Sequence, residues 1–87
     1  MKRDEREALR QELYARIDRG DLELREALRM MRAIAGTTQA EYAKLAGVSP
    51  RILMEFERGG GNPTVATLEK LFAPFGVELT LRRARPR

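Results

Sequence analysis

Few side chains in this sequence are suited to catalysis, because it contains neither cysteine nor histidine. Without them there are no thiol nucleophiles, disulfides or common zinc ligands, and the side chain best suited to proton transfer at neutral pH is missing. The carboxylates are spread along charged stretches, without a nucleophile–base pair or a catalytic phosphate-binding motif. We therefore expect a protein that is not an enzyme and uses no metal or cofactor. Its hydroxyl, amide and guanidinium groups are suited to binding.

The charge balance says little about where an anionic partner would bind. The chain has 17 basic and 13 acidic residues and a net charge of +4. Residues 83–87 form a basic tail, which either touches phosphates or stays solvated. The whole excess of positive charge comes from arginines near the end of the chain: Arg82, Arg83, Arg85 and Arg87.

The length of 87 residues and a hydrophobic content of 43% predict one compact domain over residues 1–87. No apolar run approaches the roughly 20 residues that cross a bilayer. We expect a soluble, cytoplasmic protein without membrane contact.

The first half of the chain predicts two helices. Residues 3–19 place Leu9, Leu13 and Ile17 four positions apart, which is typical of an amphipathic helix with one apolar side. A second helix is predicted over residues 24–35, with apolar residues at helical spacing and Gly36 at its end.

Two short helices follow, separated by a tight turn. Thr38 and Glu41 have the spacing of a capping box, so a third helix begins there. Gly47 ends it after little more than two turns. Ser49 is suited to the N-cap and Pro50 to the first turn of a fourth helix.

Three consecutive glycines at positions 59–61, followed by Asn62-Pro63, predict a loop that can approach another surface closely. A fifth helix is predicted to begin between Thr64 and Thr67 and to end around Pro74 or Gly76. The helical core then spans residues 24–76, and the fold class is all-α.

Residues 77–82 alternate apolar and polar side chains, with Val77, Leu79 and Leu81 on one side, as in a half-buried β-strand. The chain offers this strand no partner, so we predict pairing with the same strand of a second subunit. The alternative is an extended tail packed on the helices.

The third and fourth helices, joined by Gly47-Val48-Ser49, form a helix-turn-helix unit that presents its second helix to a DNA major groove. Residues 38–51, 56–59, 62–64 and 68–71 closely resemble the Xre, or Cro/repressor, family. The resemblance covers about residues 24 to 81. It implies a five-helix phage-repressor-like domain that binds double-stranded operator DNA as a transcriptional regulator.

The resemblance also implies which residues meet DNA. Gln39, at the start of the third helix, binds a phosphate or remains solvated. The glycine loop approaches the DNA backbone or is a plain connector. The full implied set is Thr38, Gln39, Ser49, Pro50, Arg51, Met54, Glu55, Asn62 and Thr64.

Within the fourth helix, Arg51 either binds guanine O6 and N7 or grips a phosphate. Glu55 departs from the family, in which a polar or basic residue is common at this position. Its carboxylate can accept a hydrogen bond from cytosine N4, but DNA phosphates repel it. Ile52 and Met54 are more apolar than such a helix requires. Each touches a thymine methyl group or another protein, and we favour packing against a neighbouring helix for Ile52.

Two further residues are implied to be structural. Arg32 and Glu57 form a partly buried ion pair that joins the second helix to the recognition helix. Removing one partner would leave an uncompensated charge and lower stability.

The ending, residues 75–81, is similar to that of HipB-like antitoxins, whose terminal strand joins its symmetry mate in a homodimer. This similarity implies a repressor that also binds a toxin, with the N-terminal helix around Leu9, Leu13 and Ile17 as a contact surface. A free-standing regulator is one alternative. The other is a protein-interaction module that has kept the fold without DNA binding, as the charge-balanced segment 36–63 suggests.

Overall fold

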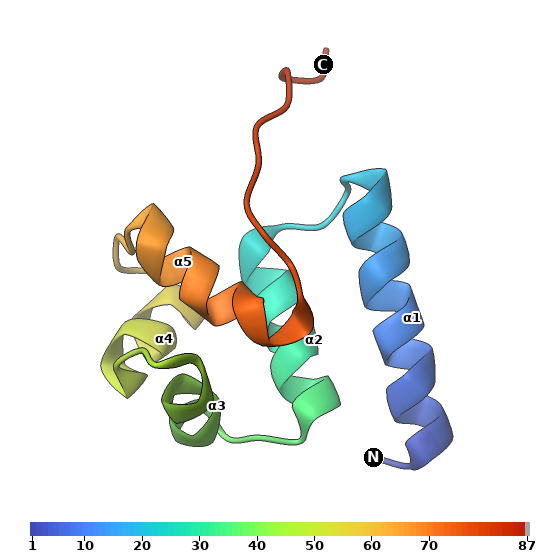
Figure 1. Cartoon of the computed structure of the whole chain (residues 1–87), viewed down its shortest axis with the longest axis vertical. Coiled ribbons are helices and arrows are strands. Elements are labelled where there is room, and N and C mark those ends of the chain that lie inside the picture. The colour runs from blue at the N-terminus through green and yellow to red at the C-terminus, as the bar shows by residue number, and fades with distance from the viewer. Residues whose placement is uncertain (87) are drawn as a thin grey trace.

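The computed structural model describes residues 1–86, which form five α-helices and one turn of 3-10 helix (Figure 1). The all-helical prediction with five helices is confirmed. Among these residues no helix is long and apolar enough to span a membrane. The elements are α1 (Arg3–Arg19), α2 (Leu24–Ala35), α3 (Gln39–Ala46), α4 (Pro50–Glu57), α5 (Val65–Phe72) and η1 (Ala73–Phe75).

Helix α2 lies in the middle of the molecule, with α1 on one side and α3, α4 and α5 on the other (Figure 1). The contacts agree with this view, because α2 packs against α1, α3 and α4, while α3 also packs against α5. One helix therefore supports both the N-terminal helix and the helix-turn-helix pair.

The turn between α3 and α4 is fixed by local interactions. Gly47 is left-handed, with φ 76° and ψ 35°, a conformation that other residues adopt at a cost. The N–H of Val48 donates to the Ala43 carbonyl at 2.9 Å. The Ser49 hydroxyl accepts from the N–H of Arg51 at 3.2 Å, and Pro50 occupies the first helical turn. The turn that aims α4 is thus encoded within a few residues.

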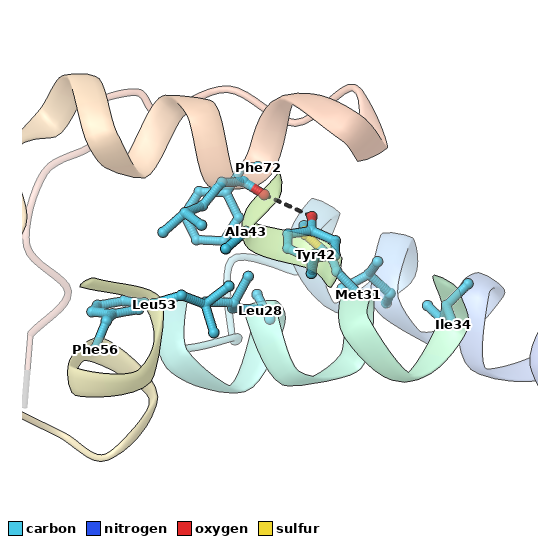
Figure 2. Packing of buried hydrophobic residues seen from close by; sticks show 11 residues of the cluster. Leu28, Met31, Ile34, Tyr42, Ala43, Leu53, Phe56 and Phe72 are labelled. Carbon is cyan, nitrogen blue, oxygen red and sulfur yellow. Dashed lines mark hydrogen bonds between the residues drawn. The ribbon is translucent and has the colours of Figure 1, made fainter. Parts of the chain in front are cut away.

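The core lies between α2, α3, α4 and α5 (Figure 2). Burial raises the pKa of Tyr42 to about 12, and its hydroxyl donates to the Leu71 carbonyl at 2.7 Å. This bond, dashed in Figure 2, joins α3 to α5. The largest fully buried side chains are Leu13, Leu28, Met31, Ile34, Tyr42, Leu53, Leu71 and Phe72.

Helix α1 is part of this core. Leu13 is fully buried, and Leu9 and Ile17 pack against the core. The Tyr14 hydroxyl donates to the Phe75 carbonyl at 2.8 Å, which ties α1 to η1. Leu13 is therefore not available to a toxin, whereas Leu9 and Ile17 are only half-buried, so the toxin contact by this helix stays a prediction.

The predicted β-strand over residues 77–82 is wrong, since no strand occurs within residues 1–86. Val77 and Leu79 pack against the helical core, whereas Leu81 is 97% exposed. An extended segment that lies on helices also turns every second side chain inward. The alternation of apolar and polar residues therefore does not require a neighbouring strand. The alternative, a tail packed on the helices, describes this segment.

The described part of the basic tail lies at the C-terminal end of α1. The Arg85 guanidinium donates to the Arg19 carbonyl, where the helix dipole favours positive charge. Figure 1 shows the tail leaving the helices on the side away from α3. The predicted tail extends to Arg87, which lies outside the described residues.

Candidate nucleic-acid interface

Helix α4 has a buried and an exposed side. Leu53 and Phe56 are buried in the core. Pro50 and Arg51 are exposed, and Met54 is 39% exposed. The side that carries the predicted base-contacting residues is therefore open to a partner.

Ile52, for which the sequence favours packing against a neighbouring helix, lies on the exposed side of α4. It is 39% exposed and borders a hollow with Asn62, Thr64 and Thr67. It therefore covers the space between α4 and the loop before α5, and part of its surface remains available to a partner.

Arg51 and Glu55 are brought together on the exposed side. The Arg51 Nε lies 3.0 Å from the Glu55 Oε1, and the Arg51 side chain is 85% exposed. The pair is one helical turn apart, a spacing at which opposite charges attract. Two predicted base-contacting side chains thus form an ion pair with each other.

Glu57 is a charged residue that is buried, at 5% exposure. Arg32 binds its carboxylate with two parallel hydrogen bonds of 2.8 and 2.9 Å. Burial by itself would raise the pKa of Glu57, but hydrogen bonds from Arg32 and Gln39 outweigh it, and the pKa lies below its usual range. The Arg32 pKa is raised by the same pairing. This pair joins α2 to the end of α4.

Gln39 is held by the same carboxylate. Its Nε2 donates to the Glu57 Oε1 at 3.1 Å, so the start of α3 is tied to the end of α4. An amide group has a second hydrogen and a carbonyl oxygen. Those groups can still meet a phosphate, so the predicted phosphate contact stays a prediction.

Three hydroxyl residues predicted to meet DNA cap the helices. The Thr38 hydroxyl accepts from the N–H of Glu41 at 3.1 Å, Ser49 caps α4, and the Thr64 hydroxyl accepts from the N–H of Thr67 at 3.1 Å. Helix starts leave N–H groups that anions can bind. These residues place the helix starts, whether or not their own hydroxyls contact DNA.

The glycine loop closes against α4. The N–H groups of Gly59 and Gly60 donate to the carbonyls of Phe56 and Glu55 at 3.0 and 2.9 Å. Gly61 has φ 71°, and a Cβ there would lie 3.4 Å from the Glu55 Cβ, so glycine permits a close approach. Asn62 is exposed beside this loop.

Two arginines of α2 also reach α4, and the sequence reasoning missed them. The Arg25 Nε donates to the Phe56 carbonyl at 2.8 Å, and its guanidinium lies 5.1 Å from the centre of the Phe56 ring. Arg29 donates to the Glu57 carbonyl. The spacing of Arg25, Arg29 and Arg32 places them on one side of a helix, but it does not show that this side faces α4.

A family model described as helix-turn-helix matches residues 28–81, from within α2 to the segment that follows η1. Neither the curated proteins nor the solved structures gave a significant match. The matched residues make up more than half of the chain and include all of α3, α4 and α5. The chain belongs to the helix-turn-helix family, as a DNA-binding regulator of the Xre type.

Proposed function

We propose that this protein is a sequence-specific transcriptional repressor that reads operator DNA with α4. The observation that carries the proposal is the two-sided character of α4. Its inner side and carboxyl end are held by the core and by α2, whereas Pro50, Arg51 and Met54 face outward. A rigid helix with an exposed side is what major-groove reading requires.

In this proposal Arg51 and Glu55 read bases as a pair. The guanidinium of Arg51 donates to guanine O6 and N7, and the Glu55 carboxylate accepts from cytosine N4. Each good contact of this kind supplies about 1–3 kcal/mol of base discrimination. Met54 contacts a thymine methyl group. These contacts require Arg51 to turn partly away from Glu55.

Phosphate contacts fix the position of the protein on DNA without reading sequence. We assign them to Gln39 and the start of α3 on one side of α4, and to Asn62 and the glycine loop on the other. We also propose a homodimer acting in the cytoplasm, whose two α4 helices read half-sites about 34 Å apart.

The similarity of residues 75–81 to HipB-like antitoxins supports the further proposal that a toxin is bound. Because Leu13 is fully buried, the toxin would bind exposed residues of α1 or another surface. Co-purification from the native host tests this: a specific partner supports an antitoxin, and its absence supports a free-standing regulator.

The competing proposal is a protein-interaction module without DNA binding, and the Arg51–Glu55 ion pair favours it. One experiment separates the two. Sequences bound by the protein are selected from random DNA, and their affinities are then measured across a range of salt concentrations. A repressor enriches one motif, and its log affinity falls linearly with log salt. No retention of any duplex at low salt would support the interaction module.

A further inference from the structure

The carboxyl end of α4 is held from outside the helix. The last carbonyls of a helix lack partners within it. Here those of Met54, Glu55 and Phe56 accept from the N–H groups of Arg58, Gly60 and Gly59. Arg29 donates to the next carbonyl, that of Glu57, and Arg25 adds a second donor to Phe56.

These donors come from one side of α2. Arg25 is half-buried and its guanidinium also lies over the Phe56 ring, an attractive cation–π arrangement. The last turn of α4 contains no basic residue, and the exposed Arg58 follows it as the C-cap. Positive charge is favourable at this end of a helix dipole, and the guanidinium groups of α2 add to that of Arg58. We call Arg25 and Arg29 the α2 clamp.

We propose that Arg25 and Arg29 are positioning residues for DNA recognition, which set the pose of α4 against α2 without touching DNA. This inference rests on the proposed function. Helix α4 has eight residues and is about 12 Å long. A tilt of about 10° about its carboxyl end moves the end that carries Arg51 by about 2 Å. That displacement is enough to break a hydrogen bond to a base.

The test replaces each arginine by lysine, singly and together: Arg25→Lys, Arg29→Lys and the double variant. Lysine keeps the charge and hence the attraction to phosphates, but it lacks the planar fork of donors. Arg16→Lys is the matched control, because Arg16 forms two hydrogen bonds with Glu26 of α2 and lies on α1. All variants are compared at a temperature where thermal unfolding shows them fully folded.

We expect each clamp variant to bind the selected DNA site about tenfold more weakly, the effect of losing one charge-assisted hydrogen bond. Affinity for random DNA and the salt dependence should stay as in the wild type. The control should change neither affinity. A purely structural role would lower the melting temperature and leave the ratio of specific to random binding unchanged in the folded protein.

A second measurement does not need DNA. Hydrogen exchange at the N–H groups of Arg58, Gly59 and Gly60 should be faster in the clamp variants, since these groups bind the carbonyls next to the clamp. Exchange at Val48, in the turn at the other end of α4, should change less.

Three results would overturn the inference: unchanged specific affinity, equal losses on selected and random DNA, or unchanged exchange at the end of α4. Equal losses would identify the arginines as phosphate contacts. If the wild type selects no sequence, the proposed repressor function is wrong, and so is the role of the α2 clamp in DNA recognition. The exchange data would then still show whether the clamp holds α4.

Discussion

At the scale of single residues, Glu57 connects three helices through one carboxylate. It accepts hydrogen bonds from Arg32 on α2 and from Gln39 on α3, while itself ending α4. Because it is 5% exposed, its charge is compensated by these groups more than by water. Loss of a partner should therefore affect the fold before it affects DNA contacts.

Arg32→Ala should destabilise the protein by about 3–5 kcal/mol, because it leaves the buried carboxylate without its main partner. Urea or thermal unfolding measures this loss. The control is Arg51→Ala, which removes an arginine whose side chain is 85% exposed and whose ion pair with Glu55 lies at the surface. A melting temperature for Arg32→Ala equal to that of the wild type would refute the importance of the pair.

Glu57 also makes stability depend on pH. Its pKa is lower in the folded than in the unfolded chain, so the unfolded chain binds the proton more readily and acid favours unfolding. The contribution is complete above the ordinary glutamate range and is lost as the pH falls through that range to the lower folded value. Thermal unfolding from about pH 7 to about pH 3 should show this loss.

Glu57→Gln should be less stable at neutral pH and show a shallower decline in acid. Some decline should remain, because hydrogen bonds from Thr38 also lower the pKa of Glu41. Glu69→Gln, at an exposed position on α5, is the control and should follow the wild-type profile. Parallel profiles for Glu57→Gln and the wild type would contradict this account.

Among the helices, the boundaries of α3 and α4 follow from short-range chemistry. Gly47 is left-handed, and a Cβ there would meet no atom within 4 Å. Gly47→Ala should therefore cost about 1–2 kcal/mol from backbone strain alone. Denaturant unfolding measures it.

Gly60→Ala is the matched control for that substitution. Gly60 is not left-handed, and its nearest atom, the Glu55 carbonyl oxygen, would lie 3.6 Å from the new Cβ. Its effect should be much smaller. Equal effects of the two substitutions would mean that the turn is not strained by alanine.

What the sequence could and could not predict depends on how far apart along the chain the interacting residues lie. The capping box at Thr38 and the N-cap at Ser49 involve neighbours in the chain, so they could be predicted. The segment at Val77 and Leu79 could not, because its alternation fits either a strand or a tail on helices. The α2 clamp depends on where the end of α4 lies in space, which spacing along α2 does not reveal.

For the whole molecule, α1 and the helix-turn-helix helices should unfold together. Leu13 is fully buried, so Leu13→Ala should cost about 2–5 kcal/mol. Circular dichroism and the NMR signal of Tyr42, which lies in α3, should report one shared transition for the variant. Leu81→Ala, at a position that is 97% exposed, is the control. Two separate transitions would show that α1 is an independent element.

The two-sided construction of α4 separates folding from recognition. Exposed positions such as 51 and 54 lie outside the core, and changes at such surface sites usually alter stability by less than about 0.5 kcal/mol. A protein built this way can acquire a new operator preference by one or two substitutions without having to be stabilised first. The same scaffold would therefore be a suitable starting point for regulators of different genes, and for engineering them.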